Sequence, residues 1–133
     1  MKDILNARIK HREWFRPFAL AVPEEDCDRW FEASYSCRYM NSLATAHPDQ
    51  KVLPEGLLFS GNRVRLQVVS QRTNPLFWRL LKKFGEQAPA PILVNTSFNL
   101  FGEPLVTDPR GAVRSFYCAG VDALALGPFF LVK

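Results

Sequence analysis

Residues 91–104 read PILVNTSFNLFGEP, and we expect the fold and its chemistry to be organised around this stretch. Residues 92–94 form an apolar run that is typical of a strand buried on both faces. A polar loop follows at once, with the side chains of Asn95, Thr96, Ser97 and Asn99. Amides and hydroxyls of this kind can hold phosphate or carbonyl oxygens without a fixed charge. The alternative is a polar turn between two core elements that binds no ligand.

The length and composition favour a small globular protein. A chain of 133 residues suits a single domain over residues 1–133. No apolar run reaches the length of a membrane span, and the start MKDILNARIKHREW is too charged for a signal peptide, so we expect a cytoplasmic protein with no membrane partner. Three scattered cysteines and two histidines indicate neither a disulfide framework nor a metal site.

Positive charge is concentrated near the amino end. The cluster comprises Lys2, Arg8, Lys10, His11, Arg12 and Arg16, against only Asp3 and Glu13. Such a cluster attracts nucleotides, acyl phosphates or nucleic acids. A solvated basic helix face that binds nothing in particular is the alternative.

The geometry of two of these cations depends on the backbone between them. We expect a short helix from Asp3 that loosens near Lys10, and Pro17 favours an extended backbone before it. In an extended segment Lys10 and Arg12 lie on one face and can grip one phosphate group. Salt bridges to acids such as Glu13 are the alternative.

The rest of the pattern alternates helices and strands, which favours an α/β or α+β sheet domain. The helices are expected over residues 23–31, 73–85 and 108–118, and the strands over residues 34–41, 63–69, 121–126 and 129–132. Residues 42–56 are expected to form a loop. In the middle helix the apolar stripe would comprise Leu76, Leu80, Leu81 and Phe84.

A second set of donors follows from the alternating strand at residues 63–69. Arg65 and Gln67 share its polar face and are candidate ligand contacts. Asn74 is a further candidate, although a helix cap before Pro75 explains it equally well.

Four blocks in order carry a resemblance to a known family. They are LNARIKHREWFRPFAL (5–20), RLQVVSQRTNPLFWRLLKKFG (65–85), PILVNTSFNLFGEPLVTDP (91–109) and AGVDALALGPFFLVK (119–133). Together they resemble the C-terminal domain of the NodU/CmcH-type O-carbamoyltransferases. The resemblance implies a YrdC-like fold, a twisted open mixed sheet with flanking helices and a basic concave face.

The resemblance also implies an activity. In that family this domain takes carbamoyl phosphate and ATP, with Mg²⁺, to carbamoyl adenylate. A larger N-terminal domain with an actin/sugar-kinase-like fold, absent from these residues and present in cis or in trans, then uses iron to transfer the carbamoyl group to a small-molecule hydroxyl. A homodimer is a further partner to consider.

The residues that match the family pattern acquire roles from it. Lys10 and Arg12 match its Lys-x-Arg pair and would act on phosphate oxygens as the catalytic cations. The binding residues would be Arg16, Arg65, Gln67, Asn74, Asn95, Thr96, Ser97 and Asn99, with Arg72 as a further cation. No protein ligand to a metal is expected, because phosphates hold Mg²⁺.

One segment departs from the family pattern. Relatives carry His-x-Asp-Gly before the strand with Arg65 and Gln67, whereas this chain has LLFSG at residues 57–61. The alternative function is therefore a non-catalytic nucleotide-binding, RNA-binding or docking module with the same fold. Of the two, we expect the enzyme domain, and nucleic acid is the less favoured partner.

Overall fold

The computed structural model describes residues 1–48, 53 and 57–133. These residues form two compact units. The terminal unit comprises Met1–Arg16 and Ser97–Lys133, and the sheet unit comprises Pro17–Thr96. Helices and a mixed sheet make this an α+β fold, as expected. The YrdC-like resemblance and the single-domain organisation stay predictions.

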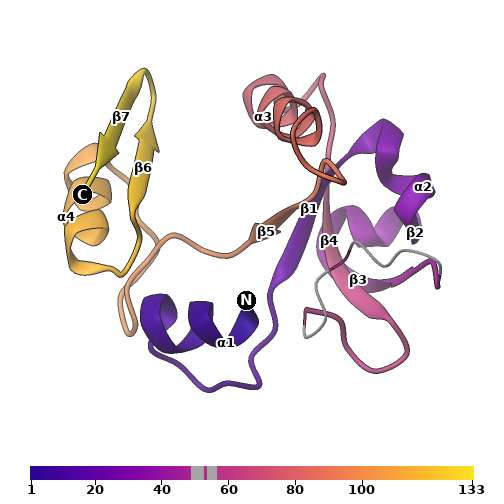
Figure 1. Ribbon diagram of the computed structural model, residues 1–133, viewed down its shortest axis with the longest axis horizontal. Coiled ribbons are helices and arrows are strands. Elements are labelled where there is room, and N and C mark those ends of the chain that lie inside the picture. The colour runs from indigo at the N-terminus through magenta and orange to yellow at the C-terminus, as the bar shows by residue number, and fades with distance from the viewer. Residues whose placement is uncertain (49–52, 54–56) are drawn as a thin grey trace. The chain divides into compact units, whose positions relative to one another are not determined.

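The sheet unit contains five strands in the order β2-β3-β4-β1-β5 (Figure 1). The strands are β1 (Ala19–Pro23), β2 (Phe31–Glu32), β3 (Tyr39–Ala46), β4 (Arg63–Val69) and β5 (Leu93–Asn95). Central strands β1 and β4 run parallel, with Ala19 opposite Arg65 and Pro23 opposite Val69. The other pairs are antiparallel, which makes the sheet mixed, as expected.

The central strands β1 and β4 bury apolar side chains on both faces of the sheet. Helix α3 (Pro75–Gly85) covers one face, where Leu81 packs on Ala21 and Val69. The opposite face carries Leu20, Val22, Val64 and Leu66, all buried. At about 25 cal/mol per Å² of apolar surface, this burial is the main source of stability for the sheet unit.

Helix α3 forms where the sequence predicts it. Asn74 caps it by accepting from the Phe77 N–H at 3.4 Å, Pro75 is its first residue and Gly85 its last. The predicted apolar stripe is wrong except for Leu81, because Leu76 and Leu80 are exposed. The side chains that pack on the core beside Leu81 are those of Phe77 and Trp78, so the helix is rotated relative to the predicted stripe.

The strand at the start of the organising stretch is not buried on both faces, so that prediction is wrong. Among the described strands β5 pairs with β1 alone, and its three residues are half-buried. Strand β5 lies at the edge of the sheet, so it has one neighbouring strand, and its free edge is open to solvent. Asn95 is its last residue rather than the first residue of a loop.

The predicted strand over residues 34–41 is confirmed for residues 39–41 and wrong for residues 34–38. Tyr35–Arg38 form a 3₁₀ turn, η3, and β3 starts at Tyr39 and runs to Ala46 into the predicted loop. Serine explains the difference, because the Ser34 hydroxyl lies 2.7 Å from that of Ser36 and its carbonyl accepts from the Cys37 N–H. The rest of the predicted loop lies partly at residues 49–52 and 54–56, outside the described residues.

The predicted helix over residues 23–31 is shorter than expected. It consists of a 3₁₀ turn, η2 (Glu24–Asp26), and helix α2 (Cys27–Trp30). Phe31 has an extended backbone and begins β2, where it pairs with Ala46.

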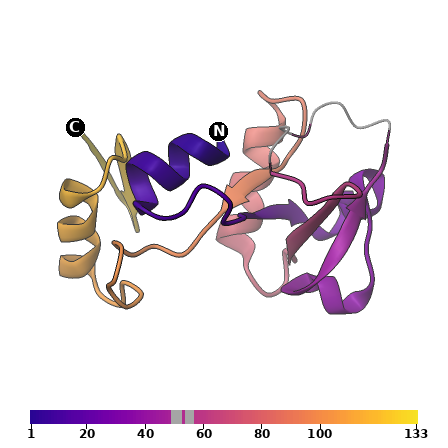
Figure 2. The ribbon, with the colours of Figure 1, turned by 90° about the horizontal axis from the view of Figure 1, so that it is seen from below.

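The terminal unit contains α1 (Lys2–Ile4), the π-helical turn η1 (Leu5–Lys10), α4 (Pro109–Cys118) and the hairpin β6 (Ala123–Leu126) and β7 (Phe129–Val132). Figure 1 shows α4 beside this hairpin, and Figure 2 shows the α1–η1 helix from below. Asp108 caps α4 by accepting from the Gly111 N–H at 2.9 Å. Among the described helices, none has the length and apolar character needed to cross a membrane.

The predicted extended backbone between Lys10 and Arg12 is wrong. Lys10 ends η1, and His11 has a left-handed backbone with φ of 45°. The chain therefore reverses sharply between the two cations, which do not lie on one strand face.

Candidate functional site

The buried ammonium group of Lys10 binds the loop that begins at Ser97. Lys10 Nζ lies 3.0 Å from the Ser97 carbonyl, 3.2 Å from Ser97 Oγ, 3.1 Å from the Asn99 carbonyl and 2.7 Å from Asn99 Oδ1. Lys10 is only 6% exposed. Its three protons are thus shared among acceptors that are all uncharged, and the lysine fixes the loop to the end of η1.

The charge state of Lys10 reflects this environment. Burial, and then the positive charge of Arg12, lower the pKa of Lys10 from its ordinary value. Neither Ser97 nor Asn99 brings a negative charge to offset the ammonium. The positive charge in this region is therefore not neutralised by its hydrogen-bond partners.

Lys10 and the loop form one wall of a pocket of about 210 Å³. We call it the anion pocket, and its lining residues are Lys10, Arg12, Arg16, Ser97, Asn99, Leu100, Phe101 and Gly102. Three of these side chains are cationic, and the acid that pairs with Arg16 is Glu13, at 3.6 Å. Both partners in that pair are about half exposed, so solvent screens it.

The loop of the anion pocket is braced internally. Ser97 Oγ donates to Asn99 Oδ1 at 2.7 Å, and Asn99 Nδ2 donates to the Glu103 carbonyl at 2.8 Å. The Glu103 carboxylate in turn accepts from Arg114 of α4 at 2.7 Å. Because each polar group has a defined partner, the hydroxyl and amide that line the pocket are held in place.

A second group of predicted residues lies on the face of the sheet against which α3 packs. Asn95 Nδ2 donates to Gln67 Oε1 at 2.6 Å, across strand β1, and also approaches the Met40 sulfur at 3.8 Å. Arg65 lies on the same face of β4 as Gln67, and its Nε is buried without a hydrogen-bond partner among the described residues. A buried donor of this kind is unusual, because most buried polar groups in proteins have a hydrogen-bond partner.

Most of the predicted site residues therefore fall into two groups, one in each unit. Lys10, Arg12, Arg16, Ser97 and Asn99 meet around the anion pocket. Arg65, Gln67 and Asn95 share the sheet face. Asn74 caps α3, and Thr96 is exposed at the end of β5. The NTSFN loop is divided between the units, after Thr96.

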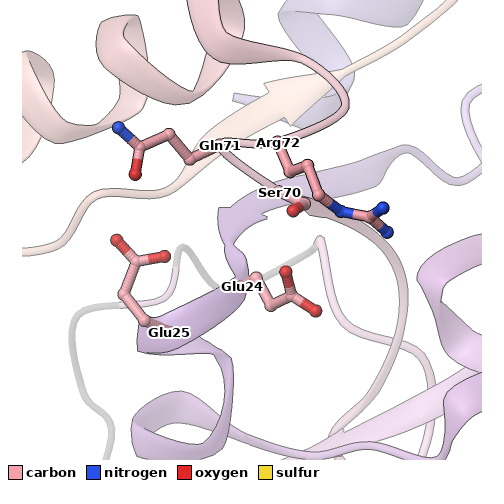
Figure 3. Close-up of a pocket in the computed structure, with 5 residues that line it drawn as sticks. All are labelled: Glu24, Glu25, Ser70, Gln71 and Arg72. Atoms are coloured by element: carbon pink, nitrogen blue, oxygen red, sulfur yellow. The ribbon is translucent and has the colours of Figure 1, made fainter.

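Sequence reasoning missed a larger pocket of about 600 Å³, lined by Glu24, Glu25, Ser70, Gln71 and Arg72 (Figure 3). It lies where the parallel strands β1 and β4 end, a common place for ligands in α/β sheets. Parallel pairing of these strands, which sequence alone does not show, is what brings the acids near Arg72.

The acids of this larger pocket already have protein partners. Hydrogen bonds from Arg38 and then Ser70 lower the pKa of Glu24. The Glu25 carboxylate accepts from Trp78 Nε1 at 3.0 Å and pairs with Lys82 at 3.3 Å. These pairings explain the charges in structural terms. Among the described residues, no group of three or more His, Cys, Asp or Glu side chains could hold a metal ion.

The chain is thus an α+β protein with a small pocket that three cationic side chains and a polar loop line. A family model described as "Carbamoyltransferase C-terminus" matches residues 1–133. The chain therefore belongs to the family of carbamoyltransferase C-terminal domains.

Individual relatives agree with this assignment. The chain is 36% identical over 135 residues to nodulation protein NolO of Bradyrhizobium diazoefficiens, covering 99% of this chain and 25% of that protein. It is 28% identical over 126 residues to 3'-hydroxymethylcephem-O-carbamoyltransferase of Amycolatopsis lactamdurans, covering 95% and 24%. It is 29% identical over 126 residues to nodulation protein U of Rhizobium tropici, covering 91% and 22%. The chain thus spans about a quarter of the length of these relatives.

Proposed function

We propose that this chain binds carbamoyl phosphate and ATP and forms carbamoyl adenylate for O-carbamoylation of a small-molecule hydroxyl. The observation that carries the proposal is the anion pocket, in which three cations surround a loop of fixed hydroxyl and amide groups. Family membership supplies the carbamoyl chemistry, and one relative is named for O-carbamoylation of a hydroxymethyl group. The pocket supplies a place for phosphate oxygens.

The residues of the pocket would divide the work. Arg12 and Arg16 would pair with phosphate oxygens, since guanidinium groups bind them bidentately. Lys10 would hold Ser97 and Asn99 in position and add its charge to the field of the pocket. Arg65, Gln67 and Asn95 of the sheet unit stay predicted binding residues that rest on the family resemblance.

The proposed reaction needs no side-chain nucleophile. Water cleaves carbamoyl phosphate to carbamate and phosphate, and a carbamate oxygen then attacks the α-phosphorus of ATP and displaces pyrophosphate. The protein would align the reactants and stabilise the charge that develops on phosphate oxygens. Mg²⁺ would enter with ATP, bound mainly by the phosphates.

In the proposal, the adenylate then passes to the larger N-terminal region that the relatives possess, where iron assists the transfer, in cis or in trans. This step, the acceptor and a homodimeric assembly belong to the proposal as expectations from the family.

Pyrophosphate release on mixing the chain with ATP, Mg²⁺ and carbamoyl phosphate tests the proposal directly. The wild-type chain should release pyrophosphate, and Arg12→Met should reduce the rate at least about tenfold, because one charge-assisted contact is lost. The matched control is Arg110→Met, which removes an exposed arginine of α4 in the same unit and should leave the rate unchanged. Equal loss in both variants, or no release by a folded wild-type chain, would reject the proposal.

The second candidate is a non-catalytic module that binds nucleotides or RNA. It is favoured by the LLFSG sequence at residues 57–61, where the family pattern has His-x-Asp-Gly. Titration of the chain with ATP alone and with generic RNA at two salt concentrations distinguishes the candidates. Strongly salt-dependent RNA binding without pyrophosphate release would favour the module.

A further inference from the structure

Asn6 is a fully buried polar residue that is not among the predicted site residues. It lies in the π-helical turn η1, four residues before Lys10, and is 1% exposed. A buried amide destabilises a protein unless its donors and acceptor are all paired. Its partners therefore indicate what the residue does.

Every hydrogen-bonding group of the Asn6 side chain is used on residues 12–16. Nδ2 donates to the Trp14 carbonyl at 3.2 Å and to the Arg16 carbonyl at 2.9 Å. Oδ1 accepts from Arg12 Nε at 2.7 Å. Two donors and one acceptor thus bind three successive points of one segment.

The main chain of Asn6 acts on the same segment. Its carbonyl accepts from the His11 N–H in the pattern of a π-helix, and from the Arg12 N–H at 3.0 Å. π-Helical turns are rare, and they occur frequently at functional sites. Here the turn and the left-handed His11 bring the chain back over Asn6, which places Arg12 and Arg16 along the anion pocket.

We infer that Asn6 is the positioning residue of the anion pocket. It does not line the pocket, and it acts through the Arg12 guanidinium and the backbone of Arg16. A hydrogen bond at Nε fixes the plane of a guanidinium group, so less side-chain entropy is lost when a ligand contacts the group. This inference deepens the proposed function and rests on it as far as ligand affinity is concerned.

The side chain required at position 6 is specific. An aspartate would retain the acceptor for Arg12 but would lose both donors and direct a carboxylate at two carbonyls. An alanine would lose all three bonds. Only a short side-chain amide provides two donors and one acceptor within this space.

The first measurement follows the Arg12 Nε–H in the 133-residue chain by NMR. In the wild type, this proton should exchange slowly with water, because it is hydrogen-bonded to Asn6. The protection should be lost in Asn6→Ala and kept in Asn6→Asp, which retains the acceptor. Fast exchange in the folded wild type would overturn the inference without any variant.

The second measurement is the affinity for carbamoyl phosphate by calorimetric titration. Asn6→Ala should weaken binding about tenfold, the loss expected when one contact to a charged group is misplaced. The control is Asp108→Ala, which removes the side-chain cap of α4 in the same unit and should leave the affinity unchanged. Wild-type affinity in folded Asn6→Ala, or an equal loss in Asp108→Ala, would overturn the inference.

The two measurements separate the inference from the proposed function. If the folded wild type binds no carbamoyl phosphate, the proposed function fails, and the Arg12 Nε–H alone decides whether Asn6 positions the arginine. If binding is present but Asn6→Ala changes neither the resonance nor the affinity, the inference fails while the proposed function stands.

Discussion

Two buried or half-buried lysines, one in each unit, show how differently this chain treats a positive charge. In the sheet unit, Lys82 binds Asp26 at 2.7 Å and Glu25 at 3.3 Å. The hydrogen bond from Lys82 to Asp26 raises the pKa of Lys82. In the terminal unit, the partners of Lys10 within the described part of the chain are uncharged oxygens of Ser97 and Asn99.

The two lysines differ in whether their positive charge is neutralised. One charge is offset by carboxylates, and the other can still attract an anion. Lys82 is neutralised by its carboxylate partners, Glu25 and Asp26. Lys10 satisfies its hydrogen bonds without losing its charge, so it still attracts anions. Hydrogen bonding and charge compensation are separate requirements, and the anion pocket meets only the first.

The largest expected effects concern the cores of the two units. Phe116→Ala in the terminal unit and Leu81→Ala in the sheet unit each remove a side chain with 0% exposure. We expect losses of about 3 to 5 kcal/mol for Phe116→Ala and about 2 to 5 kcal/mol for Leu81→Ala in the free energy of unfolding. Urea denaturation measures both. A loss below about 1 kcal/mol in either variant would show that the corresponding unit lacks the core described.

The second prediction compares the lysines themselves. Lys10→Met removes the charged donor that Ser97 and Asn99 share and should lower stability by about 2 kcal/mol, the range of a hydrogen bond to a charged group. Lys82→Met breaks partly exposed ion pairs and should cost about 1 kcal/mol or less. Urea denaturation gives both values. Calorimetric titration should show weaker carbamoyl phosphate binding only in Lys10→Met, and equal effects of the two variants would contradict the comparison.

The third prediction concerns two glycines at close approaches, one in each unit. A Cβ on Gly120 would lie 2.7 Å from the Arg8 carbonyl oxygen, and one on Gly85 would lie 2.8 Å from Pro91 Cβ. Each alanine variant should therefore destabilise the chain by about 2 kcal/mol. Gly111→Ala in α4 is the control, since its nearest neighbour lies at 3.5 Å, and it should be neutral or stabilising by about 0.5 kcal/mol.

Thermal unfolding followed by circular dichroism ranks these three glycine variants. A melting temperature of Gly120→Ala equal to that of Gly111→Ala would mean that η1 does not approach Gly120 as closely as described.

The smallest effect is the dependence of stability on alkaline pH. The pKa of Lys10 is lowered on folding, so the unfolded chain binds more protons, and the contribution of Lys10 to stability should rise as the pH approaches the unfolded value of about 10.4. The pKa of Lys82 is raised, so its contribution is complete below that value and is lost as the pH rises through the folded pKa. Urea denaturation from pH 8 upward should show slopes of opposite sign, isolated by subtracting Lys10→Met and Lys82→Met from the wild type.

Much of the local structure follows from the sequence alone. The strand with Arg65 and Gln67, the helix capped by Asn74 and the helix capped by Asp108 form at the expected residues. Alternating apolar residues, capping residues, proline and glycine act through neighbouring residues, so these patterns predicted the elements correctly. The prediction of which α3 side chains are buried was mostly wrong, because the residues that a helix buries depend on its rotation against the sheet.

The sequence also placed the cations and polar side chains of the site on the right segments, and it gave the family. The sequence alone could not show which partners these side chains have in the folded chain. Whether Lys10 faces solvent, an acid or the oxygens of Ser97 and Asn99 depends on segments about 90 residues apart, which only the folded chain brings together. The role inferred for Asn6 could not be predicted for the same reason, because it follows from hydrogen-bond partners that only the folded structure shows.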